Sequence, residues 1–269
     1  MSTADEKRSA AIESLARRDG ALVAFSGGVD SSVVAALAHE ALGPDAVACT
    51  ARSETLPASE LAAARRVAAE IGIRHEEVTF SELESEAFVR NDGERCYHCR
   101  TMRLGELIER ARELGIGTVC DGTTADDPDA GHRPGLRAVA ELDVYSPLLE
   151  HDITKAEVRE IARSDGLSVA EKPSMACLSS RIPTGIEVTA DRLTRVERAE
   201  AFLRERGFRQ FRVRDHDGLA RIEVGADELE RALDPDFARE ARGHLEAIGF
   251  EHVTLDLGGY RTGSVSPGE

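Results

Sequence analysis

Lysine is scarce in this chain of 269 residues, and long apolar runs are absent. Three of its 34 basic residues are lysines, so the other 31 are arginines. No run reaches the 18 or more apolar residues of a transmembrane helix, so we expect no membrane partner. The first residues, MSTADEKRSAA, lack the apolar core of a signal peptide. The sequence therefore predicts a cytoplasmic protein.

Basic residues are also too few to balance the acidic ones. Fifty aspartates and glutamates against 34 lysines and arginines leave a net charge of −16. Nucleic-acid-binding proteins usually present a basic face, so this balance argues against a nucleic-acid partner. An acidic, lysine-poor surface also fits a protein that lives in concentrated salt, where screening weakens self-repulsion, and salt adaptation stays open.

The cysteines are few and odd in number, five in all. An odd count in a chain of cytosolic type argues against a disulfide framework and indicates metal binding or catalysis where cysteines cluster. Cys49 and Cys120 fall inside apolar runs, where a cysteine behaves as a small hydrophobic residue. The polar segments hold Cys96, Cys99 and Cys177.

Strand-like and helix-like segments alternate through the first two thirds of the chain. Strands alternating with helices of about 10–15 residues are typical of βαβ units and a parallel sheet. We therefore predict an α/β domain over residues 1–172, with helices on both faces of the sheet. The predicted strands are 21–25, 46–50, 75–80 and 117–120, and the predicted helices are 5–18, 33–42, 57–71, 101–114 and 154–165, the last with a capping box from Thr154 to Glu157.

The pattern changes after about residue 170 and predicts a smaller α+β domain over residues 173–269. Two helices are expected, at 190–205 and 236–248, together with strands at 209–214, 221–224 and 252–257. Asp217-Gly218 is typical of a hairpin turn between the first two of these strands.

One face of that hairpin is charged. Strand alternation turns the apolar side chains inward and leaves Arg212, Arg214, Arg221 and Glu223 outward. Grouped guanidinium forks suit phosphate oxygens. A solvated charged face is also common in an arginine-rich chain, and the residues alone slightly favour that interpretation.

The most specific motif lies between the first predicted strand and helix. Its glycines let backbone N–H groups converge, its serines add donors, and the start of the helix adds a positive dipole end. It differs from the Walker loop, which requires a lysine, because no lysine is near it in the sequence. We expect it to bind an anion such as pyrophosphate, with Mg²⁺ held between Asp30 and the phosphates. The motif consists of Ser26, Gly27, Gly28, Val29, Asp30, Ser31 and Ser32.

A second motif, Cys96-Tyr97-His98-Cys99, lies in a polar stretch before a predicted helix. It fits a redox pair, half of a zinc site or part of a cluster site. A four-cysteine zinc site needs a second CxxC, which the chain lacks. Together with Cys177, three thiolates suit a [4Fe–4S] cluster with one open iron, and zinc through these cysteines and His98 is a weaker alternative.

The first motif, SGGVDSS, resembles the PP-loop of the N-type ATP pyrophosphatases, which split ATP between its α and β phosphates and adenylate a substrate. Asp121, Gly122 and Thr123, followed by Asp126, resemble that family's second ATP-facing segment. On the residues alone, the aspartates equally fit a solvated acidic loop. A PP-loop with a candidate sulfur nucleophile predicts sulfur transfer onto an adenylated substrate.

A closer resemblance covers the chain from Ala21 to about Arg261. It is similar to the LarE-type sulfurtransferases of nickel-pincer nucleotide biosynthesis, through RCYHC, DGTTADD, HRPGLRA, KPSMACLSSRIPTG, FRVRDH and ARIEV in that order. This resemblance implies an adenine nucleotide alpha hydrolase-like fold that uses ATP and Mg²⁺. It implies that the carboxylates of pyridinium biscarboxylic acid mononucleotide, a small-molecule substrate, are adenylated and then thiolated.

Two sulfur sources occur in that family. In one form the cysteine that matches Cys177 attacks the adenylate and loses its sulfur, becoming dehydroalanine. In the other form, three cysteines hold a [4Fe–4S] cluster that delivers an extra sulfide. Because it has Cys96 and Cys99 as well as Cys177, this chain resembles the cluster form.

The resemblance also assigns roles outside the reaction centre. It turns Arg181 and the charged hairpin face toward the substrate phosphate, with Asp256 and Arg261 as weaker candidates. It assigns the domain at 173–269 to substrate binding and oligomerisation, and implies a homo-oligomer and a downstream nickel-insertion enzyme as partners.

Three other functions stay open on the sequence. A PP-loop tRNA thiolase also uses a CxxC and a third cysteine, but would be expected to have a basic face. An amidotransferase-type synthetase would leave the three cysteines without a role. A nucleotide sensor without catalysis would bind ATP and release no pyrophosphate.

Overall fold

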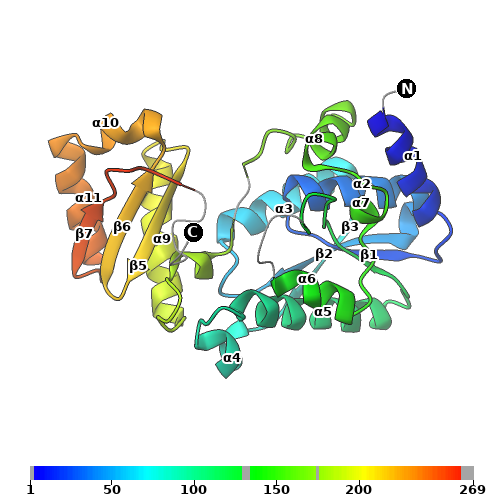
Figure 1. The fold of residues 1–269 in the computed structure, drawn as a ribbon, viewed down its shortest axis with the longest axis horizontal. Helices are drawn as coiled ribbons and strands as arrows, with labels where there is room; N and C mark the ends of the chain where they lie inside the picture. The colour runs from blue at the N-terminus through cyan, green and yellow to red at the C-terminus, as the bar shows by residue number, and fades with distance from the viewer. Residues whose placement is uncertain (1–2, 129–133, 174–175, 262–269) are drawn as a thin grey trace. The chain divides into compact units, whose positions relative to one another are not determined.

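The computed structural model describes residues 3–128, 134–173 and 176–261, and it divides the chain into two compact units (Figure 1). The first unit is Met1–Ser81 with Cys96–Met175, and the second is Glu82–Arg95 with Ala176–Glu269. Parts of two sequence motifs, His132-Arg133 and Ser174-Met175, lie outside the described residues.

A parallel sheet forms the centre of the first unit, as predicted. Its four strands lie in the order β3-β2-β1-β4. The chain therefore proceeds to one side of β1 through β2 and β3, and returns to its other side for β4. This reversal is a topological switch point, where ligands bind in α/β sheets of this kind. The strands are β1 (Ala21–Ala24), β2 (Ala46–Arg52), β3 (Arg74–Thr79) and β4 (Val119–Cys120).

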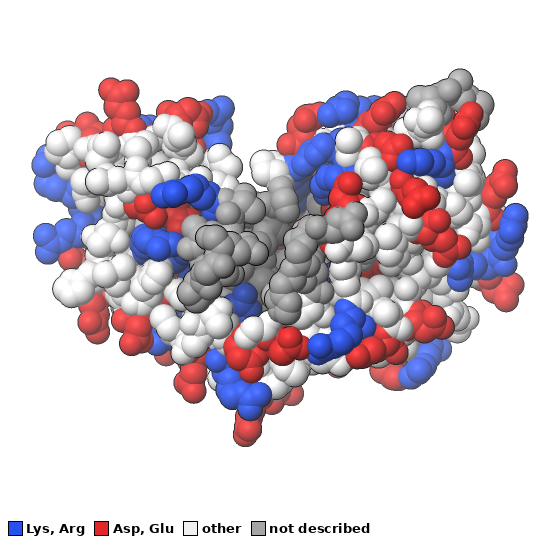
Figure 2. Space-filling view, in the orientation of Figure 1, with Lys and Arg blue, Asp and Glu red and all other residues white. Residues whose placement is uncertain are grey.

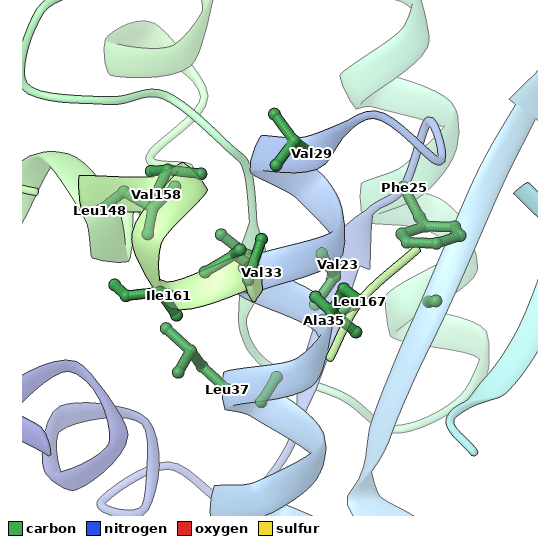
Figure 3. Close-up of a cluster of buried hydrophobic side chains, with 14 of the residues drawn as sticks. Val23, Phe25, Val29, Val33, Ala35, Leu37, Leu148, Val158, Ile161 and Leu167 are labelled. Atoms are coloured by element: carbon green, nitrogen blue, oxygen red, sulfur yellow. The ribbon is translucent and has the colours of Figure 1, made fainter. Parts of the chain in front are cut away.

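Helices cover both faces of this sheet. Ala21 and Val23 of β1 pack into one apolar cluster, whereas Leu22 between them packs into another, as alternation along a strand requires. Figure 3 shows the first cluster, in which Val33 of α2 and Ile161 of α8 meet. The first face carries α1 (Thr3–Leu15), α2 (Val29–Leu42), α3 (Ala58–Ile71), α7 (Pro147–Glu150) and α8 (Lys155–Ser164), and the second carries α5 (Arg95–Glu113) and α6 (Pro134–Glu141).

Two of these helices begin earlier than the sequence predicts. α2 starts at Val29 rather than residue 33, because the Val29 side chain packs into the core and Gly28 precedes it as the N-cap. α5 starts at Arg95 rather than residue 101, so the CxxC motif forms its first turns. Tyr97 within that motif packs on α6, where its ring lies under the Arg137 guanidinium at 3.8 Å, and this contact supports the added turns.

A smaller sheet organises the second unit. β5 and β6 are antiparallel and turn at Asp217-Gly218, where both residues have positive φ, so the predicted hairpin is confirmed. β7 pairs parallel to β6. Phe202 of α9 and Leu245 of α11 pack on the apolar face of the sheet. The elements are α4 (Glu86–Val89), α9 (Ala190–Glu205), β5 (Phe211–His216), β6 (Leu219–Val224), α10 (Leu229–Ala232), α11 (Pro235–Ala247) and β7 (His252–Leu255).

The segment 82–95, which the sequence analysis places inside the first domain, belongs to the second unit. Buried Asn91 explains why. Its side-chain amide donates to the backbone carbonyl oxygens of Pro183 at 2.8 Å and Ile186 at 2.6 Å. The backbone carbonyl oxygen of Asn91 accepts from Gly185 N at 2.9 Å. These bonds join the segment to the loop that precedes α9.

Acidic and basic side chains are mixed over the visible surface (Figure 2). Many form ion pairs, such as Arg65 with Glu77 at 2.6 Å and Arg110 with Glu76 at 2.8 Å. In each pair, the hydrogen bond from the arginine is the main reason that the pKa of the glutamate carboxyl lies below its ordinary value. Among the described helices, none has the length and apolar character that crossing a membrane requires.

The predicted capping box of α8 is confirmed, and it generates a stability prediction. Thr154 accepts from Glu157 N, and the Glu157 carboxylate accepts from Thr154 N at 2.8 Å and from Lys7 Nζ at 2.8 Å. Thr154→Ala removes the side-chain cap and should lower the free energy of unfolding by about 1 kcal/mol, measured by chemical denaturation. Thr79→Ala, at an exposed strand end, is the matched control. Equal stability of the two variants would contradict the prediction.

Candidate functional site

The PP-loop segment turns tightly between β1 and α2. Gly27 has a φ of +68°, and a Cβ built on it would lie 2.7 Å from Ala64 Cα in α3. Both facts require glycine, because a side chain would strain the backbone and collide with the neighbouring helix. The loop is therefore held directly against α3.

Hydrogen-bond donors gather where α2 begins. The first N–H groups of a helix have no partner within the helix, and they carry its positive dipole end. Ser31 Oγ donates to Gly28 O at 3.2 Å, so this hydroxyl bonds within the loop. Ser32 is fully buried, and its hydroxyl has no hydrogen-bond partner among the described residues. A buried, unpaired donor beside a helix start suits an anion.

The segment after β4 lies against this loop, as the sequence predicts. A Cβ on Gly122 would lie 3.0 Å from Ser31 N and 3.1 Å from Asp30 Cβ. Asp121 is 2% exposed, and its carboxylate accepts from Thr123 Oγ1 and from Ser146 Oγ, each at 2.6 Å. Asp121 therefore orders the segment.

Asp126 is exposed, and its carboxylate is hydrogen-bonded to the start of a helix. Its Oδ2 accepts from Lys155 N, at the first position of α8, at 2.5 Å. The carboxylate thus ties this loop to the positive N-terminal end of α8.

Two lysines contact the loop, and the sequence analysis misses both. Lys155 forms an ion pair with Asp30, and Lys172 Nζ donates to Gly27 O at 3.0 Å and to Glu60 at 2.8 Å. No lysine is near the motif in the sequence, but the fold supplies two. A lysine at a helix N-terminus opposes the dipole, and here the Lys155 ammonium is paired with the Asp30 carboxylate. In the sequence, these two lysines are marked only by the scarcity of lysine in the chain.

The cysteines separate into two chemical groups. Cys49 and Cys120 are fully buried in the core, as predicted, and burial raises the pKa of each thiol to about 12. In the first turns of α5, Cys96 is exposed and Cys99 is half-buried, with Arg103 donating to Cys99 Sγ at 3.6 Å. Unlike the two buried thiols, these two are open to solvent and can reach a ligand.

In the second unit, Arg181 organises the loop that carries Cys177. Arg181 is fully buried and pairs with Glu200 of α9 at 2.8 Å. Its Nη1 donates to the carbonyl oxygens of Ala176 at 2.8 Å and Cys177 at 3.1 Å. Cys177 Sγ lies 3.1 Å from Ser179 Oγ. The guanidinium therefore fixes the backbone on which the thiol is carried.

The charged hairpin face approaches the same loop. Arg214 pairs with Glu223 at 2.7 Å and donates to Ser180 O at 3.2 Å, and Arg221 also pairs with Glu223 at 2.7 Å. The prediction that these charged side chains share one face of the hairpin is confirmed. The interpretation of that face as exposed to solvent is wrong. Arg212 is 9% exposed, Arg214 5% and Glu223 0%. Paired charges made this burial compatible with folding.

Positive charges crowd together in this buried region. Burial lowers the pKa of Arg212 below its ordinary value, and the positive charge of Arg181 lowers it further. A bound anion would relieve this repulsion. The two weaker candidates differ in placement: Asp256 lies 3.8 Å from Arg221, while Arg261 is the last described residue.

Side chains that can bind metal ions are present, but they do not form a metal centre within the described part of the chain. Among the residues that the structure describes, no group of three or more histidine, cysteine or acidic side chains is placed to hold a metal ion. Asp30 is half-exposed beside the loop, and one carboxylate with substrate phosphates suffices for Mg²⁺. Accessible Cys96 and Cys99 fit thiolate ligands of a cluster.

Comparison with known proteins shows what this chain resembles. A family model for asparagine synthase matches residues 9–102. The NH3-dependent NAD synthetase of Campylobacter jejuni shares the fold, with a TM-score of 0.52, 15% identity and coverage of 93% of this chain and 96% of that one. A tRNA-specific 2-thiouridylase of Bradyrhizobium sp. is 32% identical over 61% of this chain and 50% of its own length.

Other relatives match over nearly the whole chain. An uncharacterized protein of Synechocystis sp. is 42% identical over 92% of each chain. The pyridinium-3,5-bisthiocarboxylic acid mononucleotide synthase of Lactiplantibacillus plantarum is 34% identical over 99% of this chain and 96% of its own. The chain is an enzyme with a PP-loop domain, and it belongs to the family of LarE-type ATP-dependent sulfurtransferases.

Proposed function

We propose that this enzyme uses ATP to adenylate the carboxylates of pyridinium biscarboxylic acid mononucleotide and thiolates them with sulfur delivered at Cys177. The observation that carries the proposal is the loop that bears Cys177 in the second unit. Buried Arg181 donates to the Cys177 carbonyl oxygen, and Arg214 donates to the carbonyl oxygen of Ser180 in the same loop. This arrangement places a sulfur atom on a loop whose backbone is fixed by two buried guanidinium groups. The Lactiplantibacillus relative, a bisthiocarboxylic acid mononucleotide synthase, supports the substrate class.

In the first step, the start of α2 and the Ser32 hydroxyl bind the phosphates of ATP. Asp30 is the residue that would hold Mg²⁺, which would supply positive charge to the phosphates. A substrate carboxylate oxygen attacks the α-phosphate, and pyrophosphate leaves. Lys155, which lies beside the loop on Asp30, stabilises the charge on the departing pyrophosphate. Lys172 is placed for the same role from the other side of the loop.

In the second step, the substrate's own phosphate is held by arginines. Arg212 and Arg214 supply cations, and Glu223 orients Arg214 and Arg221. Arg181, whose guanidinium is bonded to Glu200 and the loop, adds positive charge rather than a direct contact. We assign the ATP chemistry to the domain at 1–172 and this substrate chemistry to the domain at 173–269. The homo-oligomer and the downstream nickel-insertion enzyme remain proposals from the family resemblance.

Sulfur then displaces AMP from the acyl adenylate. In a sacrificial reaction, the Cys177 thiolate attacks the carbonyl, AMP leaves, and elimination leaves the thiocarboxylate and dehydroalanine. We favour the other source, in which Cys96, Cys99 and Cys177 would hold a cluster that would supply the sulfide. The solvent access of Cys96, Cys99 and Cys177, in contrast to the two buried cysteines, supports that choice.

The first experiment measures the intact mass of anaerobically prepared protein after reaction with ATP, Mg²⁺ and the pyridinium substrate. We expect thiolated product beside an unchanged polypeptide mass, and no product from Cys177→Ser. Loss of one H2S from Cys177 would instead establish the sacrificial source. Cys49→Ser, at a buried cysteine, is the matched control, and product formation by Cys177→Ser would contradict sulfur delivery at this residue.

A second prediction concerns Asp30. Asp30→Asn removes the carboxylate charge that holds Mg²⁺, so substrate-dependent pyrophosphate release should fall by about 100-fold or more. Asp45→Asn, at an exposed aspartate beyond α2, should leave the rate unchanged. A normal rate in Asp30→Asn would disprove the metal role.

A third prediction tests whether Lys155 acts through its compact ammonium group or through positive charge alone. Lys155→Ala should slow pyrophosphate release about 100-fold, and Lys155→Arg should restore little, because a planar guanidinium replaces a compact ammonium poorly. Lys7→Arg is the control, since Lys7 pairs with Glu157 in the same helix start as Lys155. The assignment fails when Lys155→Arg and Lys7→Arg are equally active.

A further inference from the structure

Arg100 extends from the CxxC turn of α5 to the end of β4. Its guanidinium pairs with Asp121 and donates to Thr123 Oγ1 at 3.2 Å. The Asp121 carboxylate also accepts from neutral donors: the hydroxyls of Thr123 and Ser146 and the Thr123 N–H. Because a buried carboxylate without a cation is costly, the position of Arg100 governs the position of Asp121.

Gly122 carries any shift of Asp121 to the nucleotide site. The distance from a built Cβ to Ser31 N, 3.0 Å, shows that the Gly122 backbone already touches the start of α2. Close-packed interiors transmit such displacements rather than absorb them. A movement of Asp121 therefore changes the backbone that binds the phosphates.

The other end of Arg100 is fixed to the cysteine turn. A Cβ on Gly135 of α6 would lie 3.2 Å from Arg100 Cδ and 3.6 Å from Cys96 O, so α6 packs directly on this turn. Tyr97 is also held by α6, since its hydroxyl donates to Glu141 at 2.6 Å. The aliphatic part of the Arg100 side chain is therefore packed against α6. Because it has little room there, rearrangement of the thiols moves its guanidinium.

We propose that Arg100 is a positioning residue that couples the thiols of Cys96 and Cys99 to the nucleotide site through Asp121. A ligand on the two thiols changes the affinity for nucleotide, and nucleotide changes the affinity for that ligand by the same factor. This inference rests on the proposed function for the site at the PP-loop. It adds an order to the reaction, because the state of the thiols sets how tightly ATP is held.

The test uses the full chain as Cys177→Ser, so that Cys96 and Cys99 are the accessible thiols. Cadmium is the probe, since thiolates bind this soft cation and report it by absorbance. The affinity for a non-hydrolysable ATP analogue with Mg²⁺ is measured with and without Cd²⁺. We expect Cd²⁺ to change the dissociation constant at least about fivefold. Adding Cys96→Ser and Cys99→Ser should abolish the change.

Arg100→Gln should reduce the cadmium effect to less than about twofold, and Arg100→Lys, which keeps a cation beside Asp121, should restore part of it. Arg112→Gln, on the exposed face of the same helix, should behave like the parent. A merely structural role would alter stability and basal affinity but leave the ratio of the two dissociation constants unchanged.

An equal ratio in Arg100→Gln and parent, or no cadmium effect in the parent, would overturn the coupling. If the parent binds the analogue without any cadmium effect, the nucleotide site stands and only the coupling fails. If the parent binds no analogue, both the coupling and the proposed nucleotide site fail.

Discussion

The nucleotide site depends on one close approach, that of Gly122 to the backbone at the start of α2. This approach exists because β4 pairs beside β1, opposite β2, and so delivers its carboxyl end to the PP-loop. Only a residue without a side chain fits there. With that contact made, Asp121 is buried behind the loop, and the ion pair with Arg100 becomes necessary to compensate its charge.

The second unit depends on a different constraint, the burial of arginines. Arg181 and Arg214 are removed from water and paired with Glu200 and Glu223, and their remaining donors bind carbonyl oxygens of the loop that carries Cys177. Each unit therefore uses charge compensation to fix a loop. In the first unit the loop presents helix N–H groups, and in the second it presents a sulfur.

Local patterns predicted the elements well where apolar periodicity or a cap is strong. α9 has the predicted bounds, and the hairpin at Asp217 and the capping box at Thr154 form as expected. The starts of α2 and α5 were misplaced because polar residues in a first turn lack an apolar period. Core packing of Val29 and the contact of Tyr97 with α6 decide those boundaries instead.

By itself, the sequence determined the α/β class, the PP-loop, the identity of the accessible cysteines and the family, because these reside in short contiguous motifs. Only the tertiary structure showed that Lys155 and Lys172 reach the loop and that the arginine face is buried. The reason is distance along the chain: Lys155 is 125 residues from Asp30, and no local pattern records such a pairing. Burial of a charged face likewise depends on what another segment places over it, which strand alternation cannot specify.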